Sequence, residues 1–189
     1  MDNEFKVLNY LGKQKGASFT MLSLSKFANI PYATLYRVLK GMGSLVTVLP
    51  VGKSKVVSLN EKNPVMCSYL SVSSSEEAME FLKKKPMFQK IVSELPTNDV
   101  VLLFGSYAKG KERESSDIDI LVINKKGVLS LSFSKYETLF KKKINPLFVT
   151  HKEFSRMLKE EVENVGKQVL KNHIVLNNPQ QFWECVLNG

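Results

Sequence analysis

The sequence has few of the residues that build metal centres or disulfide frameworks. Cys67 and Cys185 are the only cysteines among the 189 residues, and His151 and His173 are the only histidines. No CxxC pair is present, so both a disulfide scaffold and a zinc site of Cys and His ligands are disfavoured. Two isolated cysteines of this kind are most often reduced and structural.

Long apolar runs are also missing. No stretch approaches the roughly 20 residues that a membrane-spanning helix needs. The N-terminus, MDNEFKVLNY, has no basic segment followed by an apolar one, so it does not match a secretory signal. We therefore expect a cytoplasmic protein without a membrane partner.

The overall composition is that of a folded globular protein. Hydrophobic residues make up 43% of the chain and charged residues 24%, which argues against wholesale disorder. A chain of this length forms one large domain or two small ones, and either can bury a core.

Positive charge is in excess, and most of it is concentrated in the first third of the chain. The net charge is +9, of which residues 1–60 carry +6. Such a bias suits a polyanion such as double-stranded DNA, because neutralised phosphates release counterions. A basic surface that is merely solvated would explain the charge equally well.

Residues 1–60 contain three helix patterns followed by a hairpin pattern. Apolar spacing predicts a helix over residues 4–14, MLSLSKFANI predicts a second, and Pro31 opens a third. The β-branched runs in SLVTVLPVGKSKVVSLN flank Gly52-Lys53-Ser54 and predict a hairpin with a basic tip.

This order of elements resembles a winged helix-turn-helix module, in which the third helix enters the major groove and the hairpin contacts the DNA backbone. The resemblance implies DNA contacts at Tyr32, Thr34, Arg37 and Lys40 on the third helix and at Lys53 and Lys55 on the wing. The alternative is a winged helix used for protein binding or dimerisation. By analogy, recognition of a palindrome would favour a homodimer.

Residues 61–73 are polar and rich in serine, and we expect them to form a linker. Ser73 or Ser74, with Glu76 or Glu77 three residues later, has the spacing of a capping box and predicts the next helix start. A second domain is therefore expected over residues 74–189. In it, the strand patterns DVVLLFGS, DIDILVI and INPLFVT alternate with helix patterns, which implies a mixed α/β domain.

The first of these strands ends in a turn suited to phosphate. Gly105 permits a close approach of the backbone, and Ser106 adds a hydroxyl donor at the predicted start of a short helix. Lys109 and Lys111 add positive charge. Gly105 to Lys111 also spells the first seven positions of a P-loop, but Glu112 replaces the Ser or Thr that such a loop requires, and the following helix is missing.

Two aspartates open the next strand. Asp117 and Asp119 are two residues apart, so in a strand both side chains point to the same face. Paired carboxylates repel each other unless a cation lies between them, and Mg²⁺ prefers carboxylate and phosphate oxygens. The alternative is a pair of exposed strand aspartates with no ligand.

Together, GSYAKGKERESSDID resembles the signature of the DNA polymerase beta-like nucleotidyltransferases, and most closely that of the minimal members. The matching residues are Gly105, Ser106, Ala108, Gly110, Ser116, Asp117, Asp119 and Ile120, while Lys109 replaces the usual Arg. The resemblance implies an α/β (α+β) domain with a mixed sheet. It also implies a triphosphate bound by Gly105, Ser106 and Lys109, and catalytic Asp117 and Asp119 that bind Mg²⁺ or Mn²⁺.

The family also uses a third carboxylate on a later strand, which here should be KINPLFVT. That strand contains no Asp or Glu, and Asn145 lies near the expected place. An amide oxygen can ligate a metal but carries no charge and is a poor base. Glu137 and Glu153 lie outside the strand and would require a different geometry.

Two functions therefore remain open. One is a magnesium-dependent transferase that moves a nucleoside monophosphate from a nucleoside triphosphate to a protein or nucleic acid hydroxyl. In the minimal family, the protein acceptor is often a toxin partner. The other is a DNA-binding regulator, or antitoxin-like protein, whose second domain binds nucleotide without turnover.

Overall fold

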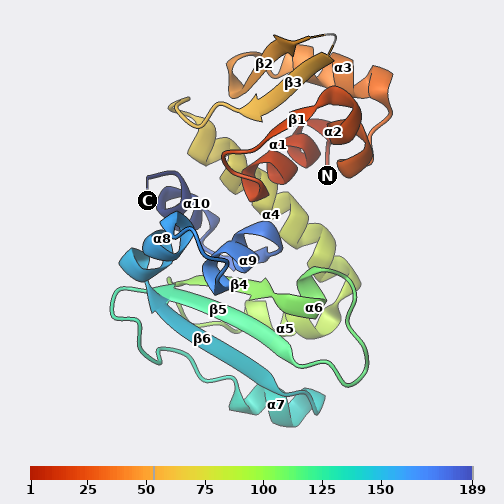
Figure 1. Ribbon diagram of the computed structural model, residues 1–189. Coiled ribbons are helices and arrows are strands. Elements are labelled where there is room, and N and C mark those ends of the chain that lie inside the picture. Colours follow the sequence, from red (N-terminus) through yellow and green to blue (C-terminus); the bar gives the residue numbers. More distant parts are fainter. Residues whose placement is uncertain (53, 189) are drawn as a thin grey trace. The chain divides into compact units, whose positions relative to one another are not determined.

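A computed structural model describes residues 1–52 and 54–188 (Figure 1). The chain forms two compact units, Met1–Glu76 and Glu77–Gly189. Each unit has a sheet of its own. Over the described residues, none of the helices has both the length and the apolar character that crossing a bilayer would require.

The N-terminal unit contains three helices and a small antiparallel sheet. Its elements are α1 (Asn3–Lys13), β1 (Ser18–Thr20), α2 (Met21–Phe27), α3 (Tyr32–Gly41), the 3₁₀ turn η1 (Gly43–Leu45), β2 (Val46–Val51) and β3 (Ser54–Leu59). The strand order is β1-β3-β2. The helices and the hairpin lie where the sequence predicted them, whereas the short strand β1 was not predicted.

Local capping and apolar spacing explain these helices. The Asp2 side chain accepts a hydrogen bond from the Asn3 N–H at the start of α1. Val7, Leu8 and Leu11 of α1 are buried, at the i, i+1 and i+4 spacing of a single helix face. In α3, Leu35 and Leu39 form the buried face, whereas Tyr36 and Arg37 between them are exposed.

Helix α4 (Met66–Lys84) corrects the expected linker. The prediction of irregular structure over residues 61–73 was wrong from Met66 onward, as was the helix start at Ser73 or Ser74. Both serines are buried within the helix, and the Ser73 hydroxyl donates to the Phe5 carbonyl oxygen at 2.9 Å. The serine-rich segment is therefore helical, and the boundary between the two domains stays a prediction.

The C-terminal unit is a mixed α/β domain. Beyond the end of α4, its elements are α5 (Pro86–Ser93), β4 (Val100–Phe104), α6 (Gly105–Ala108), β5 (Ile118–Asn124), α7 (Ser134–Phe140), β6 (Ile144–Thr150), α8 (His151–Lys159), α9 (Val165–Lys171), β7 (Ile174–Asn177) and α10 (Pro179–Asn188). The strand order is β6-β5-β4-β7. β5 and β6 are parallel, while β4 runs antiparallel to β5 and β7, so the expected mixed sheet is present.

Helices cover this sheet and hold its central strands in place. β4 and β5 are buried along nearly their whole length, with Val101, Leu103 and Ile120 in the same core cluster as Phe88 and Ile91 of α5. Helices α8 and α10 also contact these central strands. The strand ends are consequently rigid supports for side chains that project beyond the sheet.

Candidate functional site

The two aspartates lie at the start of strand β5, and their carboxylates share one hydrogen-bond donor. Asp117 immediately precedes β5, and Asp119 is its second residue. The Asn145 Nδ2 group lies 3.3 Å from Asp117 Oδ2 and 3.5 Å from Asp119 Oδ1. Both carboxylates therefore project to the same side, in the arrangement that the i, i+2 spacing predicted.

Gly105 brings the phosphate-type turn against this pair. Phe104, the last residue of β4, is paired with Asp119 across the antiparallel ladder, and Gly105 follows with a φ of +71°. A Cβ atom built on Gly105 would lie 2.1 Å from Asp119 Oδ2. Only glycine fits this contact, because a side chain would displace the carboxylate. The Gly-Ser turn and the aspartates thus form a single site.

The segment after the turn is an irregular loop whose base is held by the backbone. The Lys109 N–H donates to the Gly105 carbonyl at 3.3 Å, and the Lys111 N–H donates to that of Ser106 at 3.0 Å. Both lysine side chains are exposed, and α6 ends at Ala108. No long helix follows the turn, which agrees with the exclusion of a P-loop.

Glu112, the acidic residue of this loop, is paired rather than directed at the site. Its carboxylate forms an ion pair with the Lys85 ammonium group. The hydrogen bond from Lys85 is the main cause of a lowered pKa for Glu112. In the sequence, the negative charge of Glu112 seemed to oppose a phosphate. In the structure it is neutralised by Lys85, which is distant in sequence but in contact with it.

Asn145 occupies the place of the missing third carboxylate. In the parallel register of β5 and β6, Asn145 stands directly beside Asp119. Glu137 accepts a hydrogen bond from the Ile144 N–H at 2.8 Å, and Glu153 accepts one from the Thr150 N–H at 2.7 Å. Across residues 1–52 and 54–188, no three His, Cys, Asp or Glu side chains gather closely enough to hold a metal ion.

Lys143 is a site residue that the sequence analysis missed. Its ammonium nitrogen lies 4.0 Å from Asp117 Oδ2, and both side chains are substantially exposed. An exposed pair of this kind contributes only about 0–1 kcal/mol. The run Lys141–Lys143, immediately before the strand expected to carry the third acid, was the available signal. Its position places positive charge at the rim of the carboxylate pair.

Family comparison gives the site a context. Residues 88–181 match the family model described as polymerase beta, nucleotidyltransferase. A Methanocaldococcus jannaschii protein named "Putative protein adenylyltransferase MJ0141" is 31% identical in an alignment of 103 residues, and the alignment covers 49% of this chain and 99% of that protein. The chain belongs to the polymerase beta nucleotidyltransferase family. The comparison with solved structures gave no match.

The polymerase beta nucleotidyltransferase match includes the whole candidate site, from Gly105 to Asn145. Residues 1–87 lie outside it, so the family assignment concerns the C-terminal unit. Polymerase beta nucleotidyltransferases generally use divalent metal ions. Asp117 and Asp119 fit such an ion, because two carboxylates converge on one donor and the Asp117 side chain is 45% exposed. A rotated Asn145 amide would offer an oxygen as a neutral ligand.

The candidate DNA-contacting residues of the N-terminal unit differ in exposure. Tyr32 is 50% exposed, and Arg37, Lys40 and Lys55 are also exposed, whereas Thr34 is only partly so. Lys53 lies outside the described residues. Lys40 and Lys55 line one pocket and Tyr32 and Lys55 line another, so α3 and β3 share a surface there.

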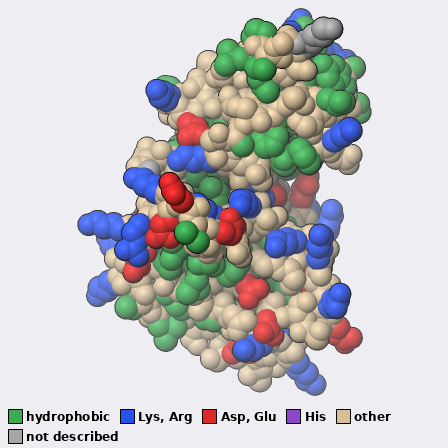
Figure 2. Space-filling model, viewed as in Figure 1, with side chains coloured by type: hydrophobic (Ala, Val, Ile, Leu, Met, Phe, Trp, Pro, Cys, Tyr) green, Lys and Arg blue, Asp and Glu red, His purple; other side chains and the backbone are tan. Residues whose placement is uncertain are grey.

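Tyr36 is a further residue of this surface that the sequence analysis did not select. The Lys40 and Lys55 ammonium nitrogens lie 4.8 and 5.6 Å from the centre of its ring. Tyr36 also lines a pocket of about 470 Å³ together with Tyr32 and Lys55. Its place between Tyr32 and Lys40 at four-residue intervals was the missed signal. Figure 2 shows apolar side chains in several groups on the visible face of this unit, with Lys and Arg beside them.

Proposed function

We propose that the C-terminal unit transfers a nucleoside monophosphate from a nucleoside triphosphate to a hydroxyl of a protein or nucleic acid. The observation that carries the proposal is the approach of Gly105 to Asp119, which packs a phosphate-type turn against a carboxylate pair. A transferase of this family needs the triphosphate and its metal ion to lie together. The name of the relative from M. jannaschii specifies transfer of an adenylyl group to protein.

Each residue has a defined part in this proposal. The Gly105–Ser106 turn binds the triphosphate, and Lys109 adds positive charge beside it. Asp117 and Asp119 hold Mg²⁺ or Mn²⁺. When bound, that ion neutralises phosphate oxygens and orients them for an in-line displacement. Asn145 holds the two carboxylates toward one point.

The N-terminal unit is proposed to bind double-stranded DNA as a winged helix-turn-helix. The support is its order of elements, the positive charge of residues 1–60, and the exposed Arg37, Lys40 and Lys55 on α3 and β3. The competing role is protein binding or dimerisation through the same surface. The apolar groups in Figure 2 are compatible with that role.

A second candidate function rests on Asn145. Since no third acid of residues 1–52 and 54–188 joins Asp117 and Asp119 in a metal-binding group, the described site has no evident base for the attacking hydroxyl. In this alternative the C-terminal unit binds nucleotide without turnover and serves a DNA-binding regulator. A toxin partner would then be bound rather than modified.

Incubation of the pure protein with Mg²⁺ and each α-labelled nucleoside triphosphate distinguishes the two candidates. The acceptors are the protein itself, candidate partner proteins and RNA. The proposed transferase labels an acceptor, and Asp117→Ala/Asp119→Ala abolishes the labelling. Saturable nucleotide binding without any transfer would instead support the second candidate, and neither binding nor transfer would refute both.

A further inference from the structure

A separate cavity lies at the end of the C-terminal sheet opposite the aspartates. It has a volume of about 400 Å³ and is lined in part by Asn124, the last residue of β5. Asp119 lies near the other end of the same strand, roughly 17 Å away at the usual rise per residue. Because β5 and β7 both run antiparallel to β4, the carboxyl ends of β5, β6 and β7 meet at this edge. In open α/β sheets, ligands bind outside the carboxyl ends of the strands.

The cavity lining has an excess of hydrogen-bond donors. Lys125 and Lys126 are exposed, and neither forms an ion pair in the described part of the chain. Its one carboxylate belongs to Asp99, whose Oδ2 already accepts the Ser130 hydroxyl at 2.7 Å. The Gln181 side-chain oxygen accepts from Asn178 at 3.0 Å, which leaves the Gln181 amide group as a donor. A ligand for this lining must be rich in acceptors.

His151 adds an unsatisfied polar atom to the same place. Its Nε2 atom is buried and has no hydrogen-bond partner. Together with Gln181, His151 also lines an adjoining cavity of about 270 Å³. A buried polar atom without a partner destabilises the fold, because the loss of its hydration is not compensated. A ligand in the cavity would supply the missing partner.

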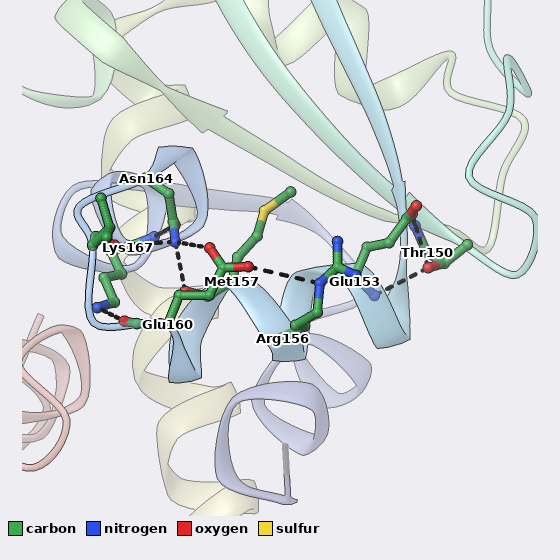
Figure 3. Close-up of polar contacts among 8 residues, drawn as sticks. Thr150, Glu153, Arg156, Met157, Glu160, Asn164 and Lys167 are labelled. Carbon is green, nitrogen blue, oxygen red and sulfur yellow. Dashed lines mark hydrogen bonds and ion pairs between the residues drawn. The ribbon is translucent and has the colours of Figure 1, made fainter.

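The charges around the cavity favour an anion. Lys125 and Lys126 outnumber Asp99, and the first residue of α8, His151, marks the positive end of that helix dipole. The nearby Glu153 is turned back onto Thr150, where it accepts the backbone N–H at 2.7 Å (Figure 3). That carboxylate is committed to the helix cap and does not compete for the two lysines.

We propose that this cavity binds a phosphate monoester, with Lys125 and Lys126 on the phosphate group and His151 and Gln181 on the remainder. Lysine ammonium groups bind phosphate as point charges, and two of them neutralise the double negative charge of a phosphate monoester. A carboxylate ligand carries a single negative charge and would need only one lysine. The site is distinct from the Gly105–Asp119 site and does not depend on its activity.

The test is a ¹H–¹⁵N and imidazole NMR titration of the full chain with glycerol 3-phosphate at constant pH and ionic strength. His151 and His173 are the only histidines, so the imidazole spectrum is simple. His173 is fully buried, with Nδ1 2.9 Å from the Val169 carbonyl oxygen, and serves as the internal reference. Saturable shifts are expected for the His151 ring and the Lys126 and Gly127 amides, with His173 unmoved.

Two double variants separate this cavity from other basic surfaces. Lys125→Ala/Lys126→Ala is expected to weaken binding at least about tenfold, from the loss of two charge-assisted contacts. Lys83→Ala/Lys84→Ala removes a matched pair of adjacent, exposed lysines outside the cavity and should leave the titration unchanged. Asp117→Ala/Asp119→Ala should also leave it unchanged.

Four results would overturn the proposal. Three of them are non-saturating shifts, equal affinity in the Lys125→Ala/Lys126→Ala variant, and equal shifts with glycerol plus acetate in place of the phosphate ester. Loss of the shifts in Asp117→Ala/Asp119→Ala would place the ligand in the other site and would also contradict it.

Discussion

The two units of this chain carry their candidate functional residues in different ways. In the C-terminal unit, strand pairing brings together residues that are distant in sequence, so that Phe104, Asp119 and Asn145 stand side by side across three strands. In the N-terminal unit, candidate residues project from a single helix and the hairpin beside it. A site of the first kind depends on exact backbone positions, whereas a surface of the second kind depends mainly on exposure and charge.

The largest effect is expected when a methyl group is added at the tightest point of the first site. Gly105→Ala places a Cβ atom 2.1 Å from Asp119 Oδ2, at a φ of +71°. Displacement of that carboxylate should lower transfer, or nucleotide affinity if no transfer occurs, on the order of 100-fold. Label transfer measures the activity of the variant, and calorimetry measures its affinity for the nucleotide.

Gly110→Ala is the matched control for that substitution. Gly110 has a φ of +62°, but no atom lies within 4 Å of an added Cβ. Both variants pay a similar backbone cost, so the difference between them isolates the contact with Asp119. Equal losses in the two variants would show that the close approach has no functional role.

A second substitution restores the acid that the family pattern expects. Asn145→Asp places a third carboxylate beside Asp117 and Asp119, within reach of the same point. A charged ligand and potential base should raise the rate of label transfer by about tenfold or more. Asn145→Ser is the control, because it removes the amide without adding charge. If the rate of label transfer in Asn145→Asp were equal to or lower than that of the wild type, the absence of a carboxylate at position 145 would not be what limits the rate.

For the surface of the N-terminal unit, a smaller effect is expected from Tyr36→Ala. Loss of the ring between Lys40 and Lys55 should weaken DNA binding about tenfold, while the dependence of affinity on salt stays nearly constant. Arg37→Ala should instead reduce the salt dependence if it contacts a phosphate.

Tyr69→Ala is the control, because Tyr69 of α4 is 38% exposed, as is Tyr36. A shift assay over a series of salt concentrations measures all three variants. If Tyr36→Ala matched wild type while the protein still bound DNA, Tyr36 would lie outside the interface. If the wild-type protein did not bind DNA, the DNA-binding proposal itself would fail.

The smallest effect concerns an ion-pair cluster whose residues belong to neither candidate site. Hydrogen bonds from Lys135 and then Lys90 lower the pKa of Glu94 from 4.5 to about 2. Because the folded-state pKa is depressed, this stabilisation is present above about pH 4.5 and is lost as the pH falls toward 2. Glu94→Gln should therefore lower the melting temperature slightly at pH 6 and not at pH 2.

Glu184→Gln is the control, because its hydrogen-bond partner is the neutral Gln180 side chain. Melting temperatures across this pH range measure the difference. A Glu94→Gln effect that does not change with pH would mean that the cluster contributes no charge-dependent stability.

The sequence predicted the parts of the site that follow from chain periodicity. Asp117 and Asp119 share a side because strand residues alternate, and Asn145 was expected near them from the order of the strands. The long-range side-chain pairs could not be predicted from the sequence. No local pattern connects Glu112 with Lys85, which lies 27 residues earlier. Side-chain partners of this kind depend on the tertiary fold.

The start of α4 shows a different limit. Serines have low helix propensity and read as a linker, yet the Ser71 hydroxyl donates to the Cys67 carbonyl at 2.7 Å and Ser75 donates to that of Ser71 at 2.9 Å. Burial of Met66 and Leu70 at i, i+4 spacing outweighs the propensity of the serines between and after them. Tertiary packing therefore decided the conformation of this segment.

We propose that Gly105–Ser106 and Asp117/Asp119 form one metal-dependent nucleotide site, whether or not transfer follows. Calorimetric titration of a nucleoside triphosphate with and without Mn²⁺ tests it most directly. We expect saturable, Mn²⁺-dependent binding that is lost in both Asp117→Ala/Asp119→Ala and Gly105→Ala and retained in Gly110→Ala. Binding that persists unchanged in the double aspartate variant, or no binding by the wild-type protein, would contradict it.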